Sequence, residues 1–272
     1  MEMFWIAGEK QQALTAHDII AYMESLRNEK QRGVLMRFFK TGPGQYGEGD
    51  EFLGHKVPQT REVVKAAAKD FPLEEVPELL MSKWHEVRLC GLLILVAKFE
   101  KLATKRLANN AEAARQRDDI LTPYLQSAEQ ANNWDLVDLS THKILGNWLL
   151  LPTFLGSEEL GMHEDYKVQV MDKLASSPCL WKQRMSIVCT WKTIQQGDSW
   201  WCLRYAEKHL HHPHDLMQKA VGWMLREMGK RVSVDLLREF LRLHAHEMPR
   251  TALRYAIELL DEDERRHWMT QK

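Results

Sequence analysis

The sequence contains little cysteine, and its placement suggests neither a disulfide framework nor a metal site. Among 272 residues there are four cysteines, Cys90, Cys179, Cys189 and Cys202, and no two of them form a Cys-x-x-Cys pair. Disulfide scaffolds are short, secreted and dense in cysteine, so this pattern argues against one. We expect reduced and mostly buried thiols in a cytoplasmic protein.

Long apolar runs are missing as well. The longest, residues 89–97, is far shorter than the roughly 20 apolar residues that span a bilayer. The N-terminus carries Glu2 and Glu9, where a secretory signal would have a basic segment followed by an apolar one. The sequence therefore predicts no membrane association and no signal peptide.

Strand patterns are nearly absent, and helical periodicity takes their place. Alternating runs rich in Val, Ile and Thr are scarce, which argues against β-structure. Amphipathic or apolar stretches predict helices over residues 16–26, 62–69, 73–81, 85–100 and 108–129. Prolines and glycines, such as Pro58, Pro72 and Pro178, fall between such stretches and separate helices of about 10–18 residues.

A loose internal repeat runs through the helical pattern. Similar short segments each open an apolar helix, about 30 to 50 residues apart, at 84–88, 133–138, 181–184, 217–221 and 248–252. This period is typical of HEAT or armadillo helix pairs, which stack into a curved solenoid with a concave face. No linker interrupts the pattern, so we expect a single domain over residues 1–272 with a frayed polar tail at residues 261–272.

Charge is unevenly distributed along the chain. The net charge is −1, but residues 181–254 hold 13 Lys and Arg against 7 Asp and Glu, whereas residues 1–180 hold 21 against 26. A local basic patch is what phosphate binding requires, even in a chain that is slightly acidic as a whole. The alternative is a set of solvated helix faces with mixed charge.

One candidate site lies in the segment Asn132–Asp138. Asn133 is a good helix N-cap, Asp135 falls in the first turn, and Trp134 and Asp138 are four residues apart, so they share one helix face. An aromatic plane beside a carboxylate suits a developing cation. Alternatively, Trp134 anchors the core and Asp138 pairs with an arginine of a neighbouring repeat.

Two further groups combine tryptophan with basic residues. Trp223, Arg226 and Lys230 follow the spacing i, i+3, i+7, which places them on one helical stripe that could contact a nucleic-acid backbone. Arg184 could grip a phosphate, and Lys192 lies further along what we expect to be the same helix. A packed tryptophan with solvated charges, or an ion pair between repeats, would explain both groups equally well.

Two other motifs carry less weight. His209, His211, His212 and His214 cluster beside an aspartate, but Pro213 interrupts them and no metal-binding motif is completed. The glycine-rich segment 41–50 lacks the Gly-Lys-Ser/Thr ending of a phosphate-binding loop and follows no strand. We interpret it as a mobile connection.

Several segments together resemble the AlkD-like DNA alkylation repair glycosylases. The matching pieces occur in the family's order and cover about residues 30–256; they are residues 36–50, 52–58, 85–88, 133–138, 181–184, 218–227 and 249–256. The glycine-rich piece and the piece Gln218–Glu227 are the most specific. The chain departs from some family members in having Asn133 where they carry a second aromatic residue.

The resemblance implies an all-α fold, a right-handed superhelical solenoid of HEAT-like helix-pair repeats that holds double-stranded DNA in its concave face. It assigns catalytic roles to Asp138, Trp134, Trp223 and Arg184. We expect DNA contacts from the basic residues Lys40, Arg61, Lys192, Arg226, Lys230, Arg250 and Arg254. No metal or organic cofactor is implied, and we expect a cytoplasmic monomer that acts on the nucleoid.

The resemblance further implies an activity: hydrolysis of the N-glycosidic bond of N3- and N7-alkylated purines in duplex DNA. Two alternatives remain at the level of the sequence. One is a non-catalytic HEAT-repeat protein that binds branched or damaged DNA. The other is a protein-interaction scaffold unrelated to DNA.

Overall fold

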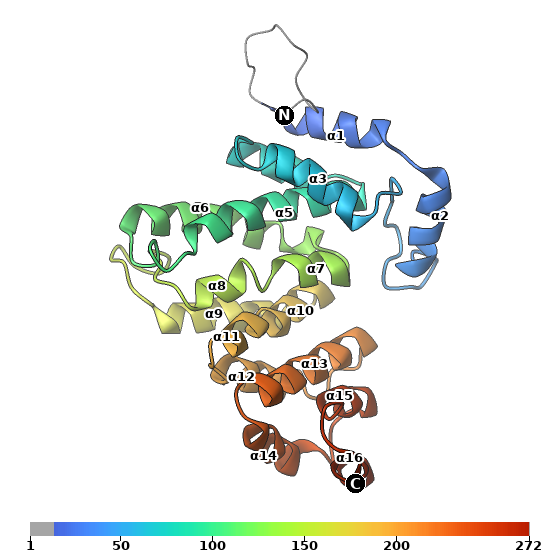
Figure 1. The fold of residues 1–272 in the computed structure, drawn as a ribbon, viewed down its shortest axis with the longest axis vertical. Coiled ribbons are helices and arrows are strands. Elements are labelled where there is room, and N and C mark those ends of the chain that lie inside the picture. The colour runs from blue at the N-terminus through green and yellow to red at the C-terminus, as the bar shows by residue number, and fades with distance from the viewer. Residues whose placement is uncertain (1–13, 272) are drawn as a thin grey trace, which may run out of the picture. The chain divides into compact units, whose positions relative to one another are not determined.

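The computed structural model describes residues 14–271, and every regular element within them is a helix (Figure 1). Two isolated bridges, Glu51 to Trp84 and Thr153 to Gly161, are the only β-contacts in this part of the chain. The all-α prediction is confirmed. The helices form two compact units, one ending at Ser140 and the other beginning at Thr141.

The first unit is built around one long, buried helix, α5. Its elements are α1 (Ala16–Ser25), α2 (Glu29–Phe38), α3 (Val57–Ala67), η1 (Leu73–Glu75), α4 (Val76–Leu80), α5 (His85–Leu102), α6 (Ala111–Gln126), η2 (Ala128–Gln130) and α7 (Trp134–Ser140). Helix α5 packs against α3, α4, α6 and α7. Of its 18 residues 13 are buried, because a helix surrounded by neighbours must be apolar on most faces.

Helix boundaries in this unit differ from the predicted ones for local reasons. Helix α3 begins at Val57 rather than at residue 62, because Pro58 is tolerated in a first turn, where its missing N–H would have no partner. Helix α6 begins at Ala111, because the side-chain oxygen of Asn110 accepts a 2.8 Å hydrogen bond from the backbone N–H of Ala113 and caps the helix.

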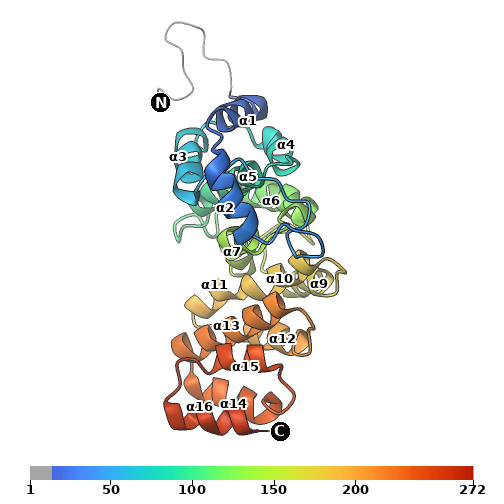
Figure 2. The ribbon, with the colours of Figure 1, turned by 90° about the vertical axis from the view of Figure 1, so that its right-hand side faces the viewer.

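The second unit is arranged around α13. Its helices are α8 (Leu145–Leu149), α9 (Glu164–Ala175), α10 (Leu180–Val188), α11 (Thr190–Gln195), α12 (Trp200–Lys208), α13 (Asp215–Arg231), α14 (Val234–His244), α15 (Arg250–Ala256) and α16 (Glu262–Thr270). Helix α13 packs against α10, α11, α12, α14 and α15, the last of which lies beside it in Figure 2. Gly222 makes this approach possible, because a Cβ there would lie 2.3 Å from the carbonyl oxygen of Ala252.

Two expectations for this unit were wrong. Arg184 and Lys192 lie on separate helices, since α10 ends at Val188 and α11 begins at Thr190. The polar tail is not frayed, because α16 forms within it. Asp261 caps this helix by accepting from the backbone N–H of Glu264, and Trp268 anchors it with only 7% of its surface exposed.

Within each unit, successive helices pack in the manner of an α-helical repeat protein. The handedness of the superhelix and the single-domain organisation stay predictions. All four cysteines are free thiols; three are buried and Cys179 is half-buried, as expected. Among residues 14–271, no helix combines the length and the apolar character needed to cross a membrane.

Candidate active site

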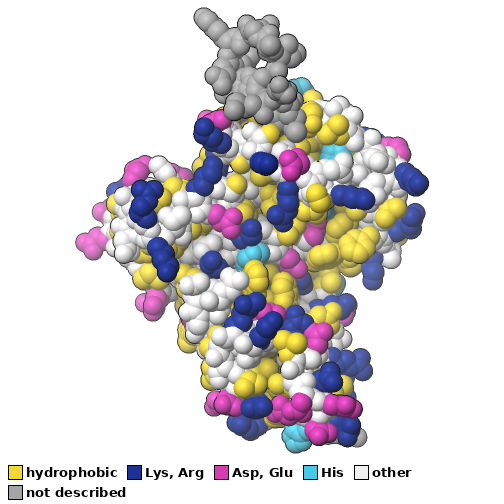
Figure 3. Space-filling view, in the orientation of Figure 1, with side chains coloured by type: hydrophobic (Ala, Val, Ile, Leu, Met, Phe, Trp, Pro, Cys, Tyr) yellow, Lys and Arg dark blue, Asp and Glu magenta, His cyan; other side chains and the backbone are white. Residues whose placement is uncertain are grey.

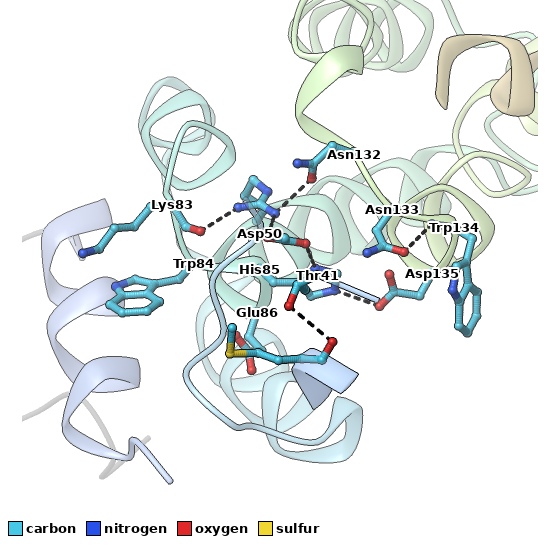
Figure 4. Close-up of polar contacts among 12 residues, drawn as sticks. Thr41, Asp50, Lys83, Trp84, His85, Glu86, Asn132, Asn133, Trp134 and Asp135 are labelled. Atoms are coloured by element: carbon cyan, nitrogen blue, oxygen red, sulfur yellow. Dashed lines mark hydrogen bonds and ion pairs between the residues drawn. The ribbon is translucent and has the colours of Figure 1, made fainter. Parts of the chain in front are cut away.

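A buried charged network lies at the start of α5 (Figure 4). His85, 2% exposed, donates from Nδ1 to Asp50 over 2.7 Å and from Nε2 to Asp135 over 2.9 Å. Its ring stacks on Phe52, with centroids 4.4 Å apart. Burial opposes a charge on His85, but attraction to Asp135 and Asp50 and hydrogen bonds with both outweigh it and raise its pKa to about 9. His85 is therefore an imidazolium at neutral pH.

Arg88, one turn further along α5, completes the network. Its Nη2 donates to Asp50 over 2.5 Å and to the side-chain oxygen of Asn132 over 2.9 Å, while Nε donates to the carbonyl of Gln130. Burial would raise the pKa of Asp50, but the contacts with His85 and Arg88 outweigh it and lower this pKa. Two carboxylates thus balance two cations, as buried charges require.

Glu86 fixes the segment that follows Asp50. Its carboxylate, 2% exposed, accepts hydrogen bonds from the backbone N–H groups of Leu53, Gly54 and His55 at 2.8–3.0 Å. The end of the glycine-rich segment 41–50 is therefore held to α5 by Asp50 and, just beyond it, by Glu86. The loop that we interpreted as a mobile connection is anchored at this end.

The network also reaches the first turn of α7. Asp135, which receives the His85 hydrogen bond, lies in the first turn of α7, beside Trp134 and one turn before Asp138. The indole N–H of Trp134 donates to the hydroxyl of Tyr46, from the glycine-rich segment, over 3.3 Å. Gly47 is required next to it, because a Cβ would lie 2.4 Å from the carbonyl oxygen of Phe39.

Trp134 and Asp138 lie together, both half-exposed, on the wall of a cavity of about 450 Å³. The rings of Phe38 and Phe39 lie 6.0 Å and 5.5 Å from that of Trp134. In Figure 3, hydrophobic side chains gather where the end of α2 lies beside α7. The sequence prediction that Trp134 and Asp138 share one face agrees with this placement.

The residues that support this pair were not identified from the sequence. His85, Asp50 and Arg88 received no individual role there, and Asp135 was interpreted only as a residue suited to a helix N-terminus. The available signal was the presence of His85, Glu86 and Arg88 directly before the longest apolar run of the sequence, residues 89–97. Charged groups that enter a core need partners, so they mark a network.

Arg184 lies in the second unit and is buried rather than presented on a surface. It is 5% exposed, and its Nη1 donates over 2.5 Å to the carbonyl of Leu216 in the first turn of α13. This contact links α10 to α13 through a backbone carbonyl, whereas the alternative that the sequence left open was an ion pair between repeats.

Trp223, Arg226 and Lys230, which were predicted to share one helical stripe, all lie on α13, but their exposure and partners differ. Trp223 is half-exposed and Lys230 is exposed. Arg226 forms ion pairs with Glu227 and Glu258 within the unit, so part of its charge is already compensated.

The remaining expected DNA contacts lie mainly on surfaces. Lys192 is half-buried, whereas the exposed members are Lys40, Arg61, Arg250 and Arg254. In the second unit, Figure 3 shows Lys and Arg side chains gathered over α11, α13 and α15, with a row of acidic side chains over α14 and α16. In the first unit, the ammonium of Lys40 lies 5.9 Å from the ring of Tyr46.

The histidine cluster forms a structural junction at the start of α13. His209 and Ser186 share a 2.8 Å hydrogen bond, His212 pairs with the Gln183 side chain, and His214 accepts from the backbone N–H of Leu216. Burial lowers the pKa of His209 to about 4, so it is neutral at physiological pH. Within residues 14–271, no group of three or more His, Cys, Asp or Glu side chains is arranged to hold a metal ion.

A family model and a solved structure both match the chain. Residues 19–260 match the family model described as DNA alkylation repair enzyme. A solved structure described as "Predicted DNA alkylation repair enzyme from Enterococcus faecalis" superposes with a TM-score of 0.60 at 14% identity, covering 87% of this chain and 97% of that one. At this identity the likeness shows a shared fold. No curated protein matches the chain. Since the family model covers most of the sequence, the chain belongs to the DNA alkylation repair enzyme family.

Proposed function

We propose that the protein is a monofunctional DNA glycosylase that removes N3- and N7-alkylated purines from duplex DNA in base excision repair. The observation that carries the proposal is that Asp138 and Trp134 line the same cavity, on a helix whose first turn is held by a buried ion network. Family membership supports a role in DNA alkylation repair.

The chemistry of the lesion fits a site built around a carboxylate. Alkylation at N3 or N7 gives the purine a positive charge, so the base leaves as a neutral molecule and needs no general acid. The sugar, in contrast, develops oxocarbenium character as the bond breaks. Asp138 would stabilise this charge and orient the attacking water. Such an interaction strengthens as the transition state forms, which raises the rate.

The other predicted residues would support this step. Trp134 and Trp223 would present electron-rich faces to the cationic sugar or lesion, worth roughly 0.5–2 kcal/mol each. Arg184, by its bond to the carbonyl of Leu216, would hold the first turn of α13, the helix that carries Trp223. Its proposed role is therefore positioning.

DNA would be held by cations on both units. Lys230, Arg250 and Arg254 are exposed on α13 and α15, and Lys40 and Arg61 are exposed in the first unit. Binding that neutralises several phosphates must weaken steeply as salt rises. The proposed enzyme is a monomer that uses no metal or organic cofactor, and its product is an abasic site.

The test is release of 7-methylguanine and 3-methyladenine from alkylated duplex DNA by wild type and by Asp138→Asn. This substitution keeps the side-chain size and removes the charge. We expect Asp138→Asn to bind DNA normally and to lose most of the activity. If wild type binds duplex DNA but releases neither base, the enzyme proposal fails and a non-catalytic binder of damaged DNA takes its place.

A further inference from the structure

We propose that the glycine-rich segment, residues 41–50, belongs to the active site and that its Tyr46 is a positioning residue for Trp134. This inference rests on the proposed function and deepens it, because Trp134 is one of the two tryptophans that would face the cationic sugar or lesion. The contact that carries the inference is a 3.3 Å hydrogen bond from the indole N–H of Trp134 to the hydroxyl of Tyr46, which lies 88 residues away in the sequence.

Three features hold the glycine-rich segment in place. Just before it, Lys40 has a left-handed backbone conformation with a φ of 53°, which residues other than glycine adopt where their surroundings enforce it. In its middle, the backbone N–H of Gly47 donates to the carbonyl of Lys40 over 3.2 Å and closes the loop. At its end, Asp50 is bound to His85 and Arg88. A loop that is closed and anchored in this way can hold a side chain in a fixed position.

Gly47 brings the loop against the residue that precedes Trp134. A Cβ at Gly47 would lie 2.4 Å from the carbonyl oxygen of Phe39 and 3.5 Å from the side-chain nitrogen of Asn133. Asn133 is fully buried, and its side-chain oxygen accepts a 2.9 Å hydrogen bond from the backbone N–H of Trp134 (Figure 4). The loop and the start of α7 therefore approach each other closely because Gly47 has no side chain, and Tyr46, next to it in the chain, reaches the indole.

The hydroxyl of Tyr46 gives the indole a direction that packing does not. Trp134 is half-exposed, and its neighbours Phe38 and Phe39 contact it through their rings, at centroid distances of 6.0 Å and 5.5 Å. Such contacts do not select where the indole N–H points, and the χ2 torsion of tryptophan is broad and roughly two-fold. The hydrogen bond to Tyr46 selects one orientation. Since a cation is attracted to the face of an aromatic ring, this orientation determines how well Trp134 stabilises charge as it develops.

The ring of Tyr46 has a second role that does not depend on its hydroxyl. The ammonium of Lys40 lies 5.9 Å from the centre of this ring, within the range of a cation–π contact, and Lys40 is exposed. The contact keeps one positive charge near the candidate site, where it is available to a phosphate of the bound strand. Loss of the hydroxyl should therefore affect the chemical step, whereas loss of the ring should also affect DNA binding.

The test compares Tyr46→Phe and Tyr46→Ala with the control Tyr166→Phe, which removes a hydroxyl from α9 in the second unit. Single-turnover excision of 7-methylguanine from duplex DNA gives the rate of the chemical step, and titration with the same duplex gives the affinity. We expect Tyr46→Phe to lower the rate roughly threefold to tenfold, the range for one lost hydrogen bond, and to leave the affinity unchanged. Tyr46→Ala should lower the rate at least as much and also weaken binding. Tyr166→Phe should change neither quantity.

The indole N–H signal of Trp134 is a readout that a merely structural role of Tyr46 would not move. In NMR spectra of protein labelled with ¹⁵N-tryptophan, this signal is identified by its absence in Trp134→Phe. We expect Tyr46→Phe to shift it more than the signal of any other tryptophan.

The two proposals fail separately in these experiments. An unshifted Trp134 signal, or excision at the wild-type rate by Tyr46→Phe, overturns the positioning role of Tyr46 and leaves the glycosylase proposal standing. If wild type releases no base, the glycosylase proposal fails. A shifted Trp134 signal then still supports the orientation of the indole by Tyr46, and an unshifted signal overturns it.

Discussion

Raising the pH should lower the stability of the first unit, because His85 loses its proton. The pKa of His85 is raised from 6.5 to about 9 because Asp135 and Asp50 stabilise its charged form against the cost of burial. A group whose pKa is raised by folding binds a proton more tightly in the folded state. The contribution of His85 to the free energy of unfolding is complete below pH 6.5 and is lost as the pH rises to about 9. The difference corresponds to roughly 3 kcal/mol, or about 1.4 kcal/mol per pH unit within that window.

The assay has two parts. NMR of the imidazole nitrogens reports the pKa of His85 directly, and amide hydrogen exchange in α5 and α7, corrected for intrinsic rates, reports the local free energy of opening between pH 6.5 and 9.5. Exchange is preferable to a global melt, because a chain of two compact units need not unfold in two states. We expect a pKa near 9 and a fall in protection in α5 and α7.

A matched variant identifies the cause. His85→Gln keeps a polar side chain that cannot change its charge. In this variant, the protection of the α5 and α7 amides from exchange should be lower than in wild type at pH 7 and should hardly change across the same pH range. Removing one partner of a buried ion pair costs roughly 3–5 kcal/mol. Titration of His85 below pH 7 in wild type, or the same pH-dependent loss of protection in His85→Gln, would show that His85 is not the cause.

Three further predictions concern single contacts. Gly222→Ala should lower the stability of the second unit by roughly 1–3 kcal/mol, because its Cβ would collide with the carbonyl of Ala252. Gly33→Ala in α2 should be neutral or stabilising, because its Cβ would meet only the flexible Arg37 side chain, at 3.8 Å. Equal melting temperatures of the two variants would contradict this. Glu86→Ala should lower the free energy of unfolding, measured in urea, by roughly 3 kcal/mol, because three backbone N–H groups lose their acceptor. A loss under about 1 kcal/mol would show that water replaces the carboxylate. Lys230→Ala should weaken binding to duplexes of any sequence and reduce the slope of log K against the logarithm of the salt concentration by about one. An unchanged slope would show that Lys230 does not contact DNA.

Local sequence patterns were enough to predict the helical class, the repeat organisation and the shared helix face of Trp134 and Asp138. These features depend on local periodicity and spacing, because a helix places residues i and i+4 on one face wherever it lies. The same logic failed where termini and packing decide the outcome. Capping by Asp261 and burial of Trp268 turned an expected frayed tail into α16, and a break at Cys189 separated Arg184 from Lys192.

The tertiary structure alone shows what holds the candidate site in place. The partners of His85 are 35 and 50 residues away in the sequence, and no periodic pattern connects positions so far apart. It also decided that Arg184 is a buried link to α13 and that Arg226 is paired with acidic neighbours. Whether a charged side chain lies on the surface or in the core depends on the segments that fold around it, and the spacing of residues along one helix does not carry that information.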